Sequence, residues 1–289
     1  MVRVACIGEA MIEMSLHEDT ADLAVAGDTL NTAVYLKRCA PKIEVDYITR
    51  LGMDPFSERI QKFIASEELG GSKISLDPVA VPGLYAITLS ASGERSFTYW
   101  RSASAARNLF ADGVFSMLEG YDLIYLSGIS LAILPNDVRR SLIAFLRTAR
   151  QRVAYDNNHR PRLWDVEEAQ KTTTEFWSFA DIALPSLDDE MAIFGESEEA
   201  VIARFSNYSM DGALKCGQGG PVSIGEVVEQ VYPAAKRVVD TTAAGDSFNG
   251  GYLAARLSGE SQAAALQAGH EMAAKVVGFR GAIIPKSAV

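Results

Sequence analysis

The chain has 289 residues, 48% of them apolar, and a formal net charge of −10. This length and apolar content can bury a large core, either as one α/β domain or as a domain with an appendage. Because no local basic cluster relieves the negative charge, the composition argues against a nucleic-acid-binding protein.

Signals of export, membrane insertion and metal binding are weak. A strand is predicted over residues 2–7, where a signal peptide would be basic and apolar, and no apolar run approaches bilayer length. We therefore expect a cytoplasmic protein without a membrane partner. The dispersed cysteines each stand beside apolar residues, which favours core thiols over disulfides or a metal site (Cys6, Cys39 and Cys216). Three scattered histidines are too few for a zinc centre.

The first part of the chain alternates strand and helix signals. After the strand at 2–7, a helix begins with Asp28 or Thr29 as its cap. A second strand is predicted over residues 45–51, and Asp54, followed by proline, starts a second helix.

Residues 84–89 and 96–101 interrupt this alternation. Both runs are rich in β-forming residues, and residues 91–95 between them are typical of a hairpin turn. We interpret the hairpin as an appendage to the α/β domain. Its second arm combines aromatic residues with Arg101, so it either lines a small-molecule pocket or forms a solvated amphipathic strand.

The alternation returns after residue 121. Strand and helix signals follow one another, which predicts a parallel α/β sheet (strands at 123–126, 153–155, 181–184 and 213–216; helices at 135–150, after Ser186 and at 263–277). A short β pair is expected at residues 222–224 and 227–231.

Polar residues collect at or just past the carboxyl ends of the predicted strands (Glu9, Asp54, Ser127, Asn157, Asn158, Ser186 and Lys215). In open α/β sheets, ligands bind at this edge. We therefore expect one active-site edge that contains all of these residues.

The stretch from Asp240 to Gly250 has the composition of a phosphate-binding turn. Small residues precede a helix that begins near Asp246, and free backbone N–H groups at a helix start attract an oxyanion. The carboxylate of Asp246 would repel a phosphate, but it suits a base that deprotonates a hydroxyl attacking that phosphate. From the helix start alone, a simple N-cap role for Asp246 ranks first.

The sequence DTTAAGDSF at residues 240–248 resembles the C-terminal signature of the ribokinase-like (PfkB) sugar kinases, and the resemblance covers essentially the whole chain. Within the family it is closest to kinases of 2-keto-3-deoxygluconate, on four further segments (residues 8–13, 27–31, 99–101 and 156–164). It implies a ribokinase-like α/β fold, with a mostly parallel central sheet flanked by helices and a small β-sheet lid. The implied organisation is one kinase domain over residues 1–289, with the lid built from segments near 10–30 and 84–102.

The resemblance implies transfer of the γ-phosphoryl group of ATP, with Mg²⁺, to the 6-hydroxyl of 2-keto-3-deoxygluconate. Asp246 would be the general base, and the turn of Ala243, Ala244 and Gly245 would present backbone N–H groups to the transferring phosphoryl group. The family commonly has glycine at the position of Ala243. We expect this change to be mild, because alanine keeps the N–H and disfavours only positive φ.

Substrate contacts follow from the resemblance, as sugar-hydroxyl ligands, pocket walls and cations (Gly27, Asp28 and Asn31; Tyr85 and Tyr99; Arg101 and Arg160), with Asp246 at the reacting hydroxyl. The planar fork of Arg101 is expected to hold the substrate carboxylate, while Arg160 could reach either substrate or phosphates. From the sequence alone, a surface ion pair is the alternative for each arginine.

Nucleotide contacts are expected from the motif residues, the glycine-rich turn after a strand and a later helix (Asn158, Arg160, Lys215, Gly217, Gly219, Gly220, Gly245 and His270). A histidine with no nucleotide contact is the alternative for His270. The metal-linked Asn-x-x-Glu motif of the family is replaced by Ser186 to Asp189. Asp189 is expected to hold Mg²⁺ through water, and an acidic helix start is the alternative.

The lid would cover the sugar and exclude water, and lids in this family often pack against a partner's lid. We therefore expect a homo-oligomer that binds a small sugar acid and ATP. Two other functions stay open: another kinase of the family, acting on fructose, a keto-deoxy-galactonate or a nucleoside, and a non-catalytic sugar or nucleotide sensor.

Overall fold

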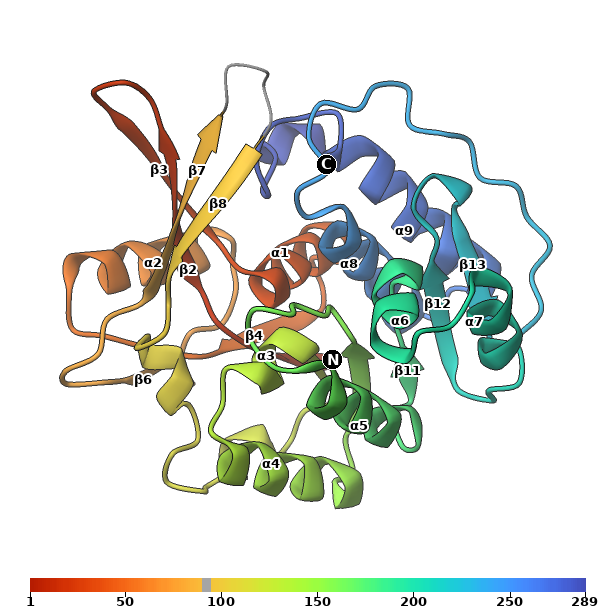
Figure 1. Ribbon diagram of the computed structural model, residues 1–289, viewed down its shortest axis with the longest axis horizontal. Coiled ribbons are helices and arrows are strands. Elements are labelled where there is room, and N and C mark those ends of the chain that lie inside the picture. Colours follow the sequence, from red (N-terminus) through yellow and green to blue (C-terminus); the bar gives the residue numbers. More distant parts are fainter. Residues whose placement is uncertain (90–94) are drawn as a thin grey trace.

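The computed structural model describes residues 1–89 and 95–289, and its centre is a seven-stranded sheet in the order β13-β12-β11-β10-β9-β1-β4 (Figure 1). The strands are β1 (Arg3–Ile7), β4 (Glu44–Ile48), β9 (Leu123–Ser127), β10 (Arg152–Asp156), β11 (Ile182–Ala183), β12 (Asp211–Lys215) and β13 (Pro221–Ile224). All neighbours pair in parallel except β12 and β13. The predicted mostly parallel sheet is therefore confirmed.

Helices cover both faces of this sheet. One face packs against α1 (Asp28–Cys39), α2 (Pro55–Ser66), α8 (Ala244–Leu257) and α9 (Gln262–Val276), and the other against α3 (Gly128–Ala132), α4 (Asn136–Thr148), α5 (Val166–Trp177), α6 (Leu187–Phe194) and α7 (Glu198–Phe205). Side chains of a strand alternate between the two cores, as Val4 and Cys6 enter one while Ala5 and Ile7 enter the other. Burial of both faces explains why the strand sequences are almost continuously apolar. No helix in the described part of the chain is long and apolar enough to cross a bilayer.

A smaller four-stranded sheet, in the order β3-β2-β7-β8, projects from the α/β body (Figure 1). It consists of β2 (Met11–Leu16), β3 (Ala21–Ala26), β7 (Gly83–Leu89) and β8 (Arg95–Trp100). The antiparallel pairing of β7 with β8 confirms the predicted hairpin. Most of the predicted turn, residues 91–94, lies outside the described residues.

The predicted strand at 45–51 is divided in the structure. Strand β4 ends at Ile48, and β5 (Arg50–Leu51) instead pairs with β6 (Ser75–Leu76) in a separate two-stranded sheet. Asp54 therefore follows a strand that is not in the central sheet. Its carboxylate accepts hydrogen bonds from the backbone N–H groups of Phe56 and Ser57, at 2.9 and 3.1 Å, and caps α2. The expectation that Asp54 stands at the active-site edge was wrong.

Two further local predictions were wrong. Residues 227–231 form no strand, and β13 pairs with β12 instead; Val227 and Val231 are exposed, so no second layer buries them. The N-cap of α1 is Gly27, while Asp28 lies in the first turn of the helix. The carboxylate of Asp28 accepts hydrogen bonds from Ser127 and Asn158 instead, which leaves it unable to cap its own helix.

Candidate active site

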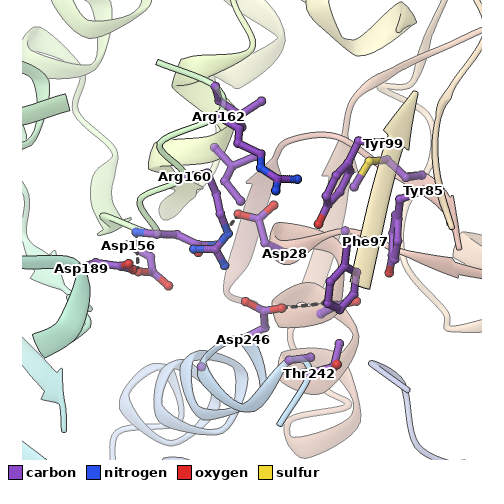
Figure 2. A pocket seen from close by; sticks show the side chains of 18 of the residues that line it. Asp28, Tyr85, Phe97, Tyr99, Asp156, Arg160, Arg162, Asp189, Thr242 and Asp246 are labelled. Atoms are coloured by element: carbon purple, nitrogen blue, oxygen red, sulfur yellow. Dashed lines mark hydrogen bonds between the residues drawn. The ribbon is translucent and has the colours of Figure 1, made fainter. Parts of the chain in front are cut away.

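A cavity of about 1380 Å³ lies between the smaller sheet and the carboxyl edge of the central sheet. Figure 2 shows its aromatic wall on one side, the arginines opposite, and Asp246 at the start of α8. Most residues expected at a site line this cavity (Gly27, Asp28, Asn31, Tyr85, Tyr99, Arg101, Asn158, Arg160, Asp189, Lys215, Gly217, Ala243, Ala244, Gly245 and Asp246). Residues more than 200 positions apart in the sequence thus share one chamber.

Asp246 stands in the first turn of α8 with its carboxylate in the cavity (Figure 2). Its Oδ2 accepts a hydrogen bond of 2.8 Å from Nδ2 of Asn31, which ties it to α1. Burial, followed by the negative charge of Asp28, raises the pKa of Asp246 to about 7. The N-cap of α8 is Ala243, and Asp246 is the third residue of the helix. The simple N-cap alternative therefore does not describe its geometry.

The turn before Asp246 leaves backbone donors free at the helix N-terminus. The N–H groups of Gly245 and Asp246 have no acceptor among the described residues, whereas that of Ala244 donates to the carbonyl oxygen of Thr241 at 3.2 Å. A helix N-terminus with unpaired N–H groups is a ready site for an anion. The turn predicted from Ala243 to Gly245 is present, but the N–H of Ala244 has an internal partner.

Ala243, the N-cap of α8, has a φ of 59° and a left-handed backbone. A left-handed conformation costs an alanine roughly 1–2 kcal/mol, which a glycine would not incur. The expectation that alanine is a mild change here was wrong, because the turn requires the one conformation that alanine disfavours. Such strain is stored where the surrounding structure holds the backbone in place.

The N-terminus of α1 forms the floor of the cavity beside α8. The backbone at Gly27 lies close to that of Glu9, and only glycine fits there, because a Cβ would lie 2.2 Å from the carbonyl oxygen of Glu9. Asp28 Oδ2 accepts hydrogen bonds from Ser127 Oγ at 2.5 Å and from Asn158 Nδ2 at 2.9 Å. These contacts join the ends of β9 and β10 to α1 and fix the carboxylate inside the cavity.

The smaller sheet supplies an aromatic wall. The rings of Tyr85 and Tyr99 lie 5.5 Å apart, and Phe97 stacks 6.4 Å from Tyr99. The Tyr85 hydroxyl donates to Glu13, while Tyr99 is 42% exposed and faces the cavity. The pocket-lining alternative for this arm of the hairpin is the one that the structure supports. Phe97 was not predicted individually, although strand alternation with Tyr99 carries that signal.

Arg101 lines the cavity but already has a partner. Its Nη2 forms an ion pair with the carboxylate of Glu9, and the two side chains are only 10% and 1% exposed. Burial is the main cause that raises the pKa of Glu9, and the charge of Arg101 opposes it. The predicted cation is therefore present at the wall, with its charge largely balanced by a buried carboxylate.

Three other arginines line the cavity without a direct ion pair among the described residues. The charge of Arg160 nevertheless acts on Asp189, where burial raises the pKa and Arg160 lowers it. Within the described ranges, Arg107, Arg160 and Arg162 form no ion pair, and Arg160 donates only to the carbonyl oxygen of His159. Figure 2 shows Arg160 and Arg162 on the wall opposite the tyrosines. Sequence reasoning missed Arg162, which follows Arg160 in the same segment, and Arg107, for which we find no signal.

The remaining predicted nucleotide residues divide into two groups. Lys215 and Gly217 line the cavity, and Lys215 Nζ donates to Asp156 Oδ2 at 2.7 Å. Gly219, Gly220 and His270 do not line it. The Nε2 of His270 lies 2.7 Å from the carbonyl oxygen of Pro233, and its ring lies 5.1 Å from that of Tyr232. Asp156 was missed as a site residue, although it starts the Asp156 to Trp164 segment.

Asp189 lines the cavity with Asp188, and burial raises the pKa of Asp189 to about 6. In the described part of the chain, no three histidine, cysteine, aspartate or glutamate side chains gather as a metal site. Mg²⁺ in phosphoryl-transfer sites is commonly held by one or two carboxylates together with water and substrate phosphates. A carboxylate pair at the cavity wall fits that mode of binding and does not fit a cage made by protein alone.

Known proteins resemble this chain over its full length. The profile of the pfkB family carbohydrate kinases matches residues 1–288. A 2-dehydro-3-deoxygluconokinase of Dickeya dadantii (strain 3937) is 42% identical, with 99% of this chain and 98% of the relative covered. The protein of that name from Escherichia coli (strain K12) is 41% identical over 99% and 98%. The crystal structure of a Vibrio cholerae O395 fructokinase bound to fructose, ADP and calcium superposes with a TM-score of 0.82, at 24% identity, over 98% of this chain and 94% of that one.

Proposed function

The chain belongs to the pfkB family of carbohydrate kinases, and we propose that it transfers the γ-phosphoryl group of ATP to the 6-hydroxyl of 2-keto-3-deoxygluconate. This compound is also called 2-dehydro-3-deoxygluconate, the sugar acid in the names of the full-length relatives. The observation that carries the chemistry is the placement of Asp246, a carboxylate in the cavity beside unpaired N–H groups at the start of α8.

In the proposed reaction, the oxygen of the sugar 6-hydroxyl forms a bond to the γ-phosphorus of ATP, and Asp246 accepts the proton of that hydroxyl. The bond between the γ-phosphorus and the β–γ bridging oxygen breaks, and that oxygen leaves with ADP. A pKa raised to about 7 suits a base that must take up a proton near neutral pH. The free N–H groups of Gly245 and Asp246 face the charge on the transferring phosphoryl group. The hydrogen bond from Asn31 holds the carboxylate in one orientation.

We propose that the sugar acid lies between the aromatic wall and the arginines. Asp28, Asn31 and the Gly27 backbone bind its hydroxyls, and Tyr85 and Tyr99 form its apolar wall. Because Glu9 balances Arg101, the excess positive charge that attracts the carboxylate comes from Arg160 and Arg162, while Arg101 contributes hydrogen-bond donors.

We propose that the nucleotide phosphates approach α8 from the side of β10 and β12, where Asn158, Lys215 and Gly217 line the cavity. The family resemblance extends this nucleotide region to Gly219, Gly220 and His270, outside the cavity. Mg²⁺ would be held by Asp189 through water, and when bound it neutralises charge on the β- and γ-phosphates. We propose that the smaller sheet acts as a lid over the sugar and packs against the same sheet of a second copy of the chain. The protein works in the cytoplasm, where ATP is supplied.

A substrate panel tests this proposal. ADP release would be measured with 2-keto-3-deoxygluconate, its galacto epimer, fructose and ribose, each with ATP and Mg²⁺. We expect the highest kcat/KM for 2-keto-3-deoxygluconate, because its carboxylate pairs with the arginine wall. A preference for fructose would contradict the assigned substrate and favour the fructokinase alternative. Binding of a sugar acid without any turnover would favour the sensor alternative.

A further inference from the structure

A buried ion pair joins the ends of two strands directly under the proposed phosphoryl site. Lys215, the last residue of β12, donates from Nζ to Oδ2 of Asp156, the last residue of β10, at 2.7 Å. The two side chains are 11% and 4% exposed. A buried ion pair is a weak device for stability, because desolvation offsets most of the Coulomb attraction. Its position at the cavity therefore calls for another explanation.

The pair is held from below by α8. Asn249 Oδ1 accepts a hydrogen bond from Lys215 Nζ at 3.2 Å, and its Nδ2 donates to Asp156 Oδ2 at 2.6 Å. The same Nδ2 donates to the Tyr125 hydroxyl at 3.1 Å. With the amide using both its oxygen and its nitrogen on the pair, the ammonium and carboxylate groups have little freedom to move.

The ammonium group stands beside the turn that carries Asp246. A Cβ built on Gly245 would lie 3.7 Å from Lys215 Nζ, so the charge adjoins the N-terminus of α8. Both Lys215 and Asp156 also line the cavity. The network also reaches Asp246 through Thr32, whose hydroxyl donates to the Asp246 carbonyl oxygen at 3.1 Å and lies 3.2 Å from the Tyr125 hydroxyl.

We propose that Asp156 and Asn249 are positioning residues that hold the Lys215 ammonium where it faces both the Asp246 carboxylate and the phosphoryl group at the α8 N-terminus. The inference rests on the proposed kinase reaction and assigns a task within it. Lys215 stabilises the anionic base and adds a cation to the N–H groups that meet the phosphoryl charge. The carboxylate of Asp156 partly balances the charge of Lys215, so that Asp246 does not experience the full effect of the ammonium group.

Lys215 and Asp156 have opposite effects on the pKa of Asp246. Titratable groups face Asp246 from five elements besides its own helix (Asp28 and Tyr35 on α1, Tyr85 on β7, Tyr125 on β9, Asp156 on β10 and Lys215 on β12). After burial and Asp28, the charge of Asp156 raises the pKa of Asp246, while that of Lys215 lowers it. Removing one member should therefore shift the titration of Asp246 in the direction opposite to removing the other.

The test measures kcat, both KM values and the pH dependence of kcat/KM for Lys215→Met, Asp156→Asn and the double variant. We expect Lys215→Met to move the ascending limb to higher pH by roughly one unit and Asp156→Asn to move it to lower pH. We expect kcat of Lys215→Met to fall by roughly a hundredfold, the usual loss of one transition-state donor, with the sugar KM nearly unchanged. Lys171→Met, on the exposed face of α5, is the control for charge loss and should behave as wild type.

If Lys215→Met does not fold because Asp156 is left unpaired, the double variant Lys215→Met/Asp156→Asn provides the test. Its kcat should be as low as that expected for Lys215→Met. The ascending limb of its kcat/KM profile should lie close to that of wild type. Shifts in the same direction, or no shift in either single variant, would overturn the inference. Difference infrared titration of the carboxyl band that Asp246→Asn removes gives the same answer without turnover. If the protein phosphorylates no sugar acid but the infrared titration of Asp246 shifts in opposite directions in the two single variants, the proposed function is refuted. The effect of Lys215 and Asp156 on the titration of Asp246 is then still supported.

Discussion

Asp246 is the residue on which the chemistry depends, and its environment makes its carboxylate harder to ionise than an exposed one. We predict that Asp246→Asn lowers kcat by roughly two to four orders of magnitude, the range of general-base catalysis. Asparagine keeps the size and an oxygen that can accept from Asn31, so the sugar KM should change little. Steady-state kinetics with 2-keto-3-deoxygluconate measures both values. Unchanged turnover would remove Asp246 from the mechanism.

The same substitution should stabilise the fold above neutral pH. The pKa of Asp246 is raised from 3.8 to about 7, so between these values the folded protein holds a proton that the unfolded chain has lost. Stability therefore falls as pH rises through this window, and the cost is fully present above pH 7. We predict that Asp246→Asn raises the free energy of unfolding at pH 8 by roughly 1–3 kcal/mol, and by little at pH 4. Denaturant unfolding at the two pH values checks this, and equal gains at both would contradict it.

Ala243 carries backbone strain at the adjoining position. Its φ of 59° favours glycine, so Ala243→Gly removes a strain of roughly 1–2 kcal/mol but adds freedom to the unfolded chain. We predict a net gain in unfolding free energy of roughly 0.5–1 kcal/mol, measured by denaturant unfolding. Glu68→Gly, at an exposed position with a φ of 58°, is the matched control and should give a similar gain without any change in kcat. A loss of stability in Ala243→Gly would mean that the alanine methyl group contributes more by packing than it costs in strain.

At the scale of elements, the sequence predicted what local pattern controls. Strands β1, β9, β10 and β12 are buried on both faces and read as apolar runs, and Asp54 before proline marks the start of α2. The split of β4 from β5 was invisible, because pairing with β6 is decided by tertiary contacts and residues 45–51 form one continuous β-like run. Val227 and Val231 have strand propensity but no partner strand, so they stay exposed.

For the candidate site as well, local sequence patterns carried the predictions, and contacts between distant segments could not be predicted. Polar residues at strand ends and the turn before α8 carry a local signal, and the structure brings Asn158, Lys215 and Asp246 together at one cavity. Partnerships between distant segments carry none. The pairing of Glu9 with Arg101, 92 positions away, depends on how the smaller sheet meets the central one, which no local pattern encodes.

The Glu9 and Arg101 pair connects the two sheets, because Glu9 follows β1 and Arg101 follows β8. We predict that Arg101→Leu lowers the unfolding free energy by roughly 3–5 kcal/mol, since it leaves a buried carboxylate without its cation. Glu9→Gln/Arg101→Leu should recover much of this loss. Both variants should raise the KM for the sugar acid and leave the KM for ATP nearly unchanged.

Thermal unfolding and steady-state kinetics measure these effects, with Arg101→Lys as a variant that keeps the charge and loses the planar fork. If the double variant is as unstable as Arg101→Leu, the carboxylate of Glu9 is not the cause of the loss. Equal increases in both KM values would place Arg101 beside the phosphates.

For the molecule as a whole, we propose that the smaller sheet is the part that moves on ligand binding. One set of its side chains forms a small buried cluster with Ala282 (Met11, Ala26, Tyr85 and Ile87), whereas Ile12 and Val25 pack into one of the two large cores. Segments with few buried apolar contacts open at lower free energy than the core, and lids are drawn from them. The central sheet, packed on both faces, provides the rigid edge against which such a lid can close.

We predict that sugar acid and ATP binding slows amide hydrogen exchange in β7 and β8 by roughly tenfold or more, because closure over the ligand suppresses opening of this sheet. The measurement uses Asp246→Asn, which should bind both ligands with little turnover, and compares each strand with α4. Helix α4 lies across the molecule from the smaller sheet and should be unaffected (Figure 1). Adding ATP alone should protect β12 more than β8, because the proposed nucleotide region adjoins β12. Binding seen by calorimetry with no protection in β7 and β8, or with equal protection in α4, would show that the smaller sheet is a fixed wall and not a lid.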